Sequence, residues 1–231
     1  MKYILVLSFS FFLISCSQSN KPSVTTFETK KDSISYSIGM EIGINFQSQS
    51  VEVNSDVFAQ GFHDSYTEST PLMEDSEMRE ITQNYRQELR LKQDEKRKQQ
   101  LEENTVGGEK FLAENSTKEG VIVLPSGLQY KVINNWDGIV PKTTDKVKVH
   151  YSGKLIDGTV FDSSVERGEP STFGVTQVIK GWTEALQLIS VGDKWEVYIP
   201  SNLAYGVRGK GPKVGPNSTL VFEVELLGIE N

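Results

Sequence analysis

One carboxylate of this sequence is placed where an apolar strand should run into a core. In GTVFDSS (residues 158–164), Asp162 directly follows Phe161. A half-buried aspartate costs free energy unless another group pairs with it or uses it. Three roles fit such a residue: a general acid, a metal ligand, or a carboxylate that neighbouring side chains hold in place.

Other residues capable of chemistry are few. The two histidines, His63 and His150, have no partner at metal-ligand spacing, so each is expected to be a surface or packing residue. No serine–histidine–aspartate set and no G-x-S-x-G motif occurs. The run GVRGKGPKVG (206–215) lacks the Lys-Ser/Thr ending of a phosphate loop, and Pro212 and Pro216 forbid the helix that follows such loops. We therefore expect no metal and no cofactor.

Charge and composition exclude further classes. The net charge is −7, with 37% hydrophobic and 24% charged residues. Almost all of the net negative charge lies in residues 1–120, and no part of the chain has the basic footprint of a nucleic-acid-binding protein. The sequence thus predicts a polypeptide that has no nucleic-acid partner.

The N-terminus has the layout of a secretory signal. The apolar run 4–14 is too short to span a bilayer. It ends in LISC (13–16), which resembles a bacterial lipobox, where the cysteine is lipidated. Cys16 is the only cysteine, so a disulfide within the chain is excluded. We expect a lipoprotein signal peptide at residues 1–16 and a flexible polar tether at 17–30.

Residues 31–118 carry mainly helical patterns, with one ambiguous segment. SISYSIGMEIGINF (33–46) alternates apolar with small or polar residues, which by period alone indicates a strand. Ser35, Gly39 and Gly43 recur every four residues, and two glycines weaken a strand interior. On a helix the same segment has two apolar stripes with small residues between them. We favour this helix, buried on two faces against a partner subunit.

Two more helices are predicted in this half. NSDVFAQGFHDSYTE (54–68) begins at a capping Asn54 or Ser55 and spaces its apolar residues for a helix. A long helix is expected over about 74–117, and its part 92–100 is polar on every face, as in helices that cross solvent. The alternative is a disordered charged linker. Gly107-Gly108 is the expected weak point.

After Gly120 the period becomes 2 and glycines multiply. Alternating apolar residues predict strands at 127–134, 145–153, 194–200 and 219–227. One short helix is predicted at 179–189, where Trp182, Leu186 and Ile189 share a face. The predicted fold class is α+β: an antiparallel sheet curled over a short helix, preceded by an all-α region with a long connecting helix.

Four segments of this second half resemble the FKBP-type peptidyl-prolyl isomerases in order and spacing: VHYSGKLIDGTVFDSS, VIKGWTEALQLISVGDKWEVYIP, AYG and PNSTLVFEVELL. Upstream, SYSIGMEIGINF, VFAQGF and the long charged helix resemble the N-terminal dimerisation region of the macrophage-infectivity-potentiator (Mip) and FkpA class. With the lipobox, the resemblance covers almost the whole chain. It implies a helical dimerisation domain at 31–118 and an FKBP-type isomerase domain at 120–231.

The resemblance also implies a site of ten residues. Its implied catalytic residues are Tyr151, Phe161, Asp162, Tyr205 and Phe222. Its implied substrate-binding residues are Arg167, Val178, Ile179, Trp182 and Val214. Tyr151 and Arg167 are implied to hold Asp162 at the pocket edge, so that no proton transfer is needed. The chain departs from the family at Ser171, where many members carry an aromatic wall, and at Lys210 and Lys213 in the loop after Tyr205.

The function implied is isomerisation of X–Pro bonds in unfolded or partly folded exported proteins, with clients held in the cleft of a homodimer. The lipid anchor would be the only membrane contact, at the outer membrane of a Gram-negative bacterium, facing the periplasm or the cell surface. A non-catalytic chaperone or surface binding module that keeps the fold is the alternative. A third interpretation makes residues 31–118 an unrelated coiled-coil spacer.

Overall fold

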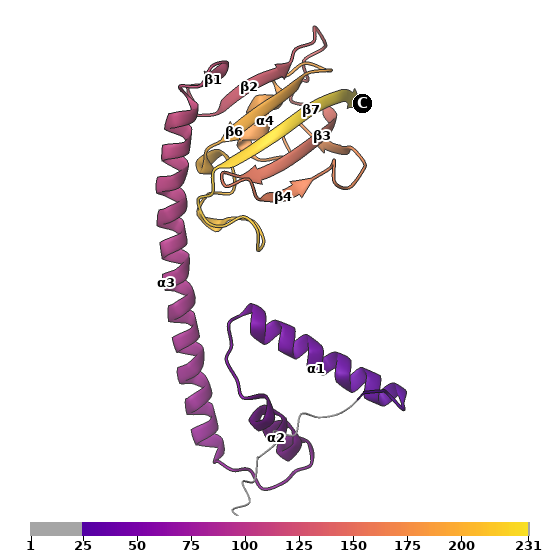
Figure 1. The fold of residues 1–231 in the computed structure, drawn as a ribbon, viewed down its shortest axis with the longest axis vertical. Coiled ribbons are helices and arrows are strands. Elements are labelled where there is room, and N and C mark those ends of the chain that lie inside the picture. Colours follow the sequence, from indigo (N-terminus) through magenta and orange to yellow (C-terminus); the bar gives the residue numbers. More distant parts are fainter. Residues whose placement is uncertain (1–24, 231) are drawn as a thin grey trace, which may run out of the picture. The chain divides into compact units, whose positions relative to one another are not determined.

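The computed structural model describes residues 25–230, which form two compact units whose boundary in the sequence lies between Met78 and Arg79. The signal peptide, the lipobox Cys16 and most of the tether lie outside the described residues. The first three helices precede all strands in the chain (Figure 1). They are α1 (Lys30–Ser48), α2 (Ser55–Tyr66) and α3 (Asp75–Asn115).

The ambiguous alternating segment is a helix, and its start is set just outside the alternating run. Thr29 caps α1 in a capping box: its hydroxyl accepts from the Asp32 amide at 3.2 Å, and the Asp32 carboxylate accepts from the Thr29 amide at 2.8 Å. Asn54 caps α2 by accepting from the amides of Asp56 and Val57. These caps fix where both helices begin.

Neither α1 nor α2 contains a buried residue. Large apolar side chains on both helices are between about two-fifths and three-quarters exposed. On α1 they are Ile34, Tyr36, Ile38, Met40 and Ile44, and on α2 they are Val57, Phe58, Phe62 and Tyr66. One aromatic contact joins the two helices, Phe46 edge-on to Phe58 at 5.6 Å between ring centroids. The first unit therefore exposes the apolar stripes predicted for α1.

Helix α3 has 41 residues, which corresponds to about 60 Å at 1.5 Å per residue. It passes through Gly107-Gly108 without a break, so the expected weak point is not one. Glycine is needed at position 108 because the helix passes close to Thr219. A Cβ on Gly108 would collide with the Thr219 side chain. Further along, the Phe111 ring packs against Tyr198 with centroids 6.0 Å apart. From Arg79 onward α3 belongs to the second unit, and its second half packs against the sheet.

The second unit is an antiparallel sheet in the strand order β1-β2-β6-β7-β3-β4, with β5 paired to β3. Its central strands follow the predicted ones closely, and β4 lies in the segment around Asp162 where an apolar strand was expected, whereas β1 and β5 were not predicted as strands. The bounds are β1 (Val121–Val123), β2 (Gln129–Asn134), β3 (Lys146–Leu155), β4 (Val160–Ser163), β5 (Ser171–Gly174), β6 (Lys194–Ile199) and β7 (Leu220–Glu230). The α+β prediction is confirmed.

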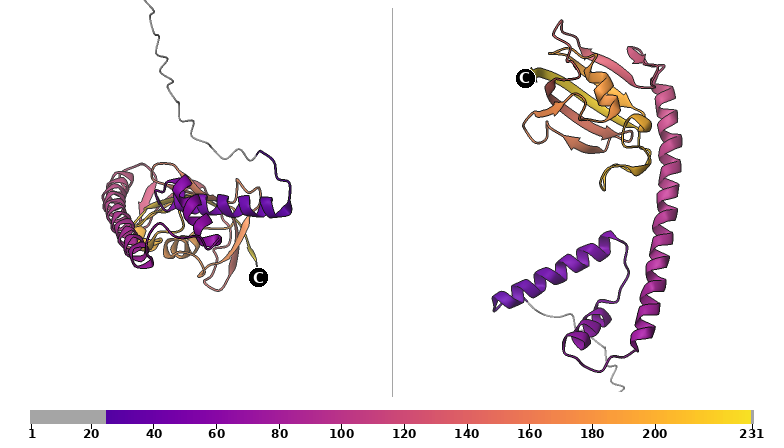
Figure 2. Two further views of the ribbon diagram at one scale, coloured as in Figure 1. Left: turned by 90° about the horizontal axis from the view of Figure 1, so that it is seen from below. Right: turned by 180° about the vertical axis from the view of Figure 1, so that it is seen from behind.

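One short helix, α4 (Lys180–Leu186), covers one face of the sheet (Figure 2). Its buried Trp182 and Leu186 join inward residues of β3, β6 and β7 in a single hydrophobic core. Gly181 makes this packing possible, because a Cβ there would lie 2.5 Å from Ile199. The core thus forms between α4 and the strands that the period-2 pattern identified.

Candidate active site

Strand pairing places the Asp162 carboxylate beside the core. Gly153 of β3 lies opposite Asp162 of β4 on one side and opposite Phe222 of β7 on the other. Two residues earlier on β3, Tyr151 points to the same face and is buried. The sheet register therefore gathers a carboxylate, a phenol and a phenyl ring from three strands.

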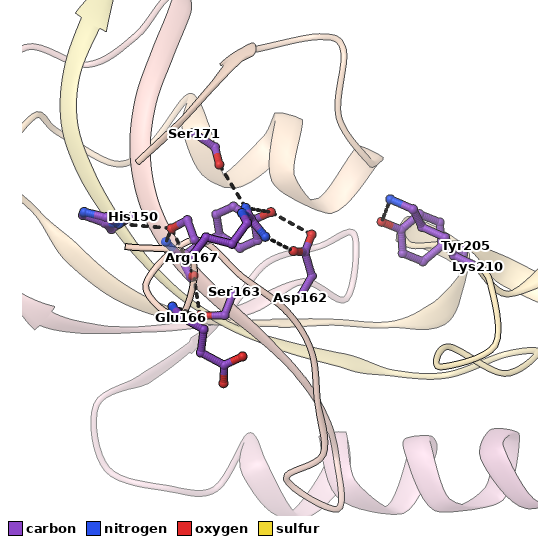
Figure 3. Close-up of polar contacts among 10 residues, drawn as sticks. His150, Asp162, Ser163, Glu166, Arg167, Ser171, Tyr205 and Lys210 are labelled. Atoms are coloured by element: carbon purple, nitrogen blue, oxygen red, sulfur yellow. Dashed lines mark hydrogen bonds and ion pairs between the residues drawn. The ribbon is translucent and has the colours of Figure 1, made fainter. Parts of the chain in front are cut away.

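Polar neighbours hold Asp162 in place (Figure 3). The Tyr151 hydroxyl donates to Asp162 Oδ2 at 2.7 Å, and the Arg167 guanidinium forms an ion pair with Asp162 Oδ1. Arg167 Nη2 also donates to the Tyr151 hydroxyl oxygen at 3.1 Å and to Ser171 Oγ at 3.2 Å. The carboxylate is therefore fixed from two sides, and Ser171 takes part in the network instead of forming an aromatic wall.

The protonation states follow from these contacts. Burial raises the pKa of the Asp162 carboxyl, but the hydrogen bonds from Tyr151 and Arg167 outweigh it and leave that pKa below its ordinary value. Burial and the hydrogen bond to Asp162 raise the pKa of the Tyr151 hydroxyl. At neutral pH the aspartate is thus ionised and the phenol is protonated. An aspartate in this state is unsuited to act as a general acid.

Aromatic rings surround the space beside this network. Trp182 meets Tyr151 edge-on at 5.3 Å and Phe222 edge-on at 5.2 Å between centroids. Phe161 meets Phe222 edge-on at 5.5 Å. Such T-shaped contacts are the favourable geometry for aromatic pairs. The wall needs a glycine behind it, since a Cβ on Gly153 would lie 2.6 Å from the Phe222 ring and 2.7 Å from the Phe161 ring.

The rings enclose a cavity of about 330 Å³. It is lined by Tyr151, Phe161, Asp162, Phe173, Gln177, Val178, Ile179, Trp182, Tyr205, Lys210 and Phe222. Eight of the ten site residues expected from the sequence are among them. Arg167 does not line the cavity but forms an ion pair with Asp162, which does. Val214 does not line the cavity, because it is buried in the adjacent loop, where it pairs with Lys210.

Three lining residues were absent from the sequence-based site: Phe173, Gln177 and Lys210. Phe173 follows Ser171 by two positions on β5, so strand periodicity places it on the same face and could have identified it. The other two belong to irregular loops, where no period indicates direction.

The loop that carries Lys210 is attached to the second half of α3. Arg97 Nη2 donates to the Val207 carbonyl at 2.7 Å, and Asn104 Nδ2 donates to the Pro216 carbonyl at 2.7 Å. Asn217 Nδ2 adds a bond of 3.0 Å to Thr105 Oγ1. Both ends of the loop 206–217 are therefore bound to the helix.

The described residues contain no cluster suited to metal binding. Over residues 25–230, no group of three or more His, Cys, Asp or Glu side chains is arranged to hold a metal ion. His150 Nδ1 lies 3.1 Å from Ser164 Oγ and outside the cavity lining, as a packing histidine would. What the cavity offers is an apolar aromatic surface, a fixed carboxylate and the Tyr205 hydroxyl. This arrangement suits the binding of an apolar ring together with the amide next to it.

Comparison with known proteins identifies the class. Residues 116–227 match the family model described as FKBP-type peptidyl-prolyl cis-trans isomerase. Residues 31–132 match the model of the domain amino-terminal to such isomerases. The chain belongs to the FKBP-type peptidyl-prolyl cis-trans isomerases and is an enzyme of that type, as its sequence motifs predicted.

Relatives that match most of the chain refine this assignment. The outer membrane protein MIP of Legionella longbeachae is 44% identical over 206 residues, which are 89% of this chain and 88% of that one. The FKBP-type 22 kDa peptidyl-prolyl cis-trans isomerase of Escherichia coli is 45% identical and is covered over 98% of its length. The crystal structure of FkpA from E. coli superposes with a TM-score of 0.66 at 32% identity, covering 89% of this chain. The predicted resemblance to the Mip and FkpA class is confirmed.

Proposed function

We propose that the aromatic cavity is the site at which this isomerase turns over X–Pro bonds of unfolded or partly folded exported proteins. The observation that carries the proposal is the T-shaped ring set on Trp182, which forms an apolar floor for a proline ring. Phe161 and Phe222 form the walls. Tyr205, at the cavity edge, is in a position to donate to the carbonyl of the bound peptide.

The mechanism follows from the physics of the amide. Rotation about an X–Pro bond crosses a barrier of about 18–20 kcal/mol, because amide resonance must be broken. The twisted transition state has lost resonance, and its carbonyl is less polar than in the planar ground state. An apolar cavity therefore disfavours the planar state more than the twisted one, and each 1.4 kcal/mol or so of this difference gives a tenfold rate increase.

Asp162 supplies a fixed field and transfers no proton in this mechanism. Its charge is held by Tyr151 and Arg167, both of which keep their own protons at neutral pH. A preorganised charge next to the rotating amide stabilises the charge distribution of the transition state without reorganisation during the reaction. The same contacts hold the Asp162 side chain in one orientation at the cavity wall.

A refolding assay tests the site. The slow phase of a proline-limited protein is followed with catalytic amounts of the full chain, of Phe161→Ala and of Phe111→Ala. Both rings are half-buried, but Phe111 packs on Tyr198 outside the cavity. We expect roughly tenfold or greater loss of kcat/KM for Phe161→Ala and little change for Phe111→Ala. Equal activity of both variants would place the site elsewhere.

The N-terminal helices support a proposed homodimer. The exposed apolar residues of α1 and α2 require a partner surface, and a second copy of the same helices would supply one. Residues 31–118 would then form the dimerisation domain, and residues 120–231 the isomerase domain. Two linked cavities could hold one client at two points and raise its effective concentration, which is the chaperone-like part of the function.

Sedimentation tests the dimer. A soluble chain that starts at residue 25 should sediment as a dimer at micromolar concentration, and Ile38→Asp together with Ile44→Asp should make it monomeric. The peptide isomerisation rate per chain should stay unchanged in that variant. A chain that sediments as a monomer without substitution would refute the dimer. An unchanged oligomeric state after removal of residues 25–74 would favour the spacer interpretation.

We also propose that lipidation at Cys16 anchors the protein at the outer membrane, on its periplasmic side or at the cell surface. The support is the lipobox sequence and a relative named an outer membrane protein. Over residues 25–230, no helix combines the length and the apolar character needed to cross a bilayer. Cys16→Ser should move the protein from the membrane fraction to the soluble fraction. Retention in the membrane fraction would argue against the anchor.

A further inference from the structure

A cation that the isomerase mechanism does not use lies at the cavity rim. Lys210 Nζ donates to the Tyr205 hydroxyl oxygen at 3.2 Å and lies 5.1 Å from the centroid of its ring. Lys210 also lines the cavity itself. In Figure 3 this pair and Arg167 lie on opposite sides of Asp162. The ammonium group is thus next to the hydroxyl expected to bind the peptide carbonyl.

The backbone holds Lys210 at this place. Gly209 and Gly211 flank it with positive φ angles of 66° and 59°, which favour glycine. The Lys210 amide donates to the Val214 carbonyl at 2.8 Å, and the Val214 amide donates back at 3.3 Å. Because the Val214 side chain is buried, this small closed turn is anchored in the core. Lys210 therefore starts from a fixed point of the rim.

The charges around the cavity leave Lys210 available. Asp162 is the one carboxylate among the lining residues, and it is already paired with Arg167. Within the described part of the chain, Lys210 forms no ion pair with any carboxylate. An ammonium group has three donors, and Tyr205 occupies one of them. Two cations thus face one anion, and the rim keeps a positive charge with free donors.

We propose that Lys210 makes this enzyme favour X–Pro bonds flanked by an acidic side chain. The inference rests on the proposed proline site on Trp182. With the proline ring on that floor, the next residue along the peptide is about 3.8 Å away between Cα atoms and leaves the cavity at its rim. A glutamate or aspartate there can reach the free donors of Lys210. Its amide counterpart would gain only a weaker, uncharged contact.

The alternative role for Lys210 is to position Tyr205 alone. A lysine with only that role would change the rates of acidic and neutral peptides by the same factor. The ratio of the two rates within one variant therefore isolates the charge effect. It also cancels any general loss of activity that the substitution causes.

The experiment measures kcat/KM of the full chain on matched peptides. One pair carries Glu or Gln directly before the proline, and a second pair carries Glu or Gln directly after it. The proteins are wild type, Lys210→Met, Lys210→Glu and, as a control, Lys213→Met. Lys213 belongs to the same loop but is exposed and does not line the cavity.

For at least one pair, we expect the wild-type Glu/Gln ratio to be about two to five at low salt, the range of a solvent-accessible ion pair. The ratio should approach one in about 1 M salt, where the screening length is only about 3 Å. Lys210→Met should bring it to one, Lys210→Glu below one, and Lys213→Met should leave it unchanged.

A ratio of one for wild type in both pairs would overturn the proposal, and so would an equal loss in Lys210→Met and Lys213→Met. Neither outcome contradicts the isomerase activity itself, because the turnover of the Gln peptides measures that activity separately. A Glu/Gln ratio that falls to one in Lys210→Met but is retained in Lys213→Met would assign the charge effect to Lys210, because the ratio is independent of any change in the turnover of neutral peptides.

Discussion

The two compact units of this chain use large apolar residues in opposite ways. In the second unit, such residues from the sheet and α4 form one core and the aromatic cavity. In the first unit, α1 and α2 have no buried residue, and residues such as Ile44 and Phe62 are about 60% exposed. The second unit thus has a buried core of its own, although single side chains such as Trp136 and Ile139 are exposed, whereas the helices α1 and α2 of the first unit bury none of their large apolar side chains.

Removing the same kind of side chain from each unit should affect their stabilities very differently. Leu186→Ala should lower the free energy of unfolding of the second unit by about 2–5 kcal/mol, because Leu186 is 1% exposed in the core. Ile44→Ala should leave it unchanged. All three tryptophans belong to the second unit, so tryptophan fluorescence during urea unfolding reports on it alone. Equal losses in both variants would show that the units are not independent.

A second prediction adds one carbon atom to the packed wall of the cavity. Gly153→Ala should destabilise the second unit by about 1–3 kcal/mol and lower kcat/KM, since the new Cβ must displace the rings of Phe161 and Phe222. Gly228→Ala is the matched control on the neighbouring strand β7, because a Cβ there meets nothing within 4 Å. A Gly153→Ala variant with normal stability and rate would mean that these walls yield easily.

A third prediction concerns α3, the helix that continues from one unit into the other. Arg97→Ala with Asn104→Ala removes two bonds to the loop 206–217 and should cost about 1 kcal/mol per bond. It should also lower kcat/KM, because the loop carries Lys210 and follows Tyr205. The control is Lys98→Ala, an exposed neighbour on the same helix. A variant pair that loses neither stability nor activity would refute a positioning role for α3.

A fourth prediction concerns the charge of the Asp162 carboxylate. Asp162 has its pKa lowered by folding, below the usual value of about 3.9. An acid with a depressed folded-state pKa stabilises the fold above its unfolded-state pKa, and the stabilisation is lost as pH falls through the folded-state pKa. The difference in unfolding free energy between wild type and Asp162→Asn should therefore be constant from about pH 8 to 5 and shrink below about pH 4. A difference that changes between pH 6 and 8 would contradict this assignment.

The sheet and the ring set could be predicted from the sequence because period 2 directly assigns inward residues. Val147, Val149 and Tyr151 are buried as their alternation predicts, while Lys148 is exposed. For 33–46 the same alternation pointed to a strand, and the recurrence of small residues every four positions favoured the helix. The capping box of Thr29 and Asp32, which fixes its start, lies just upstream of the segment.

The parts that could not be predicted depend on contacts between distant residues. Lys210 reaches the cavity because the loop 206–217 turns at glycines and is bound to α3 residues more than a hundred positions earlier. Val214, expected in the site, is instead the buried anchor of that turn. Local sequence carries no signal for such a path. The continuity of α3 at Gly108 likewise depends on Thr219, which is far away in the chain.

The contact between α3 and the sheet also determines where the chain can be cut. A fragment that begins at Gly120 contains every strand but loses Gly108 and Phe111, which cover Thr219 and Tyr198. Exposure of the Tyr198 ring, which Phe111 covers in the intact chain, adds apolar surface that promotes aggregation. A truncated enzyme for crystallisation or ligand discovery should therefore retain the second half of α3, even though that half looks like mere linker in the sequence.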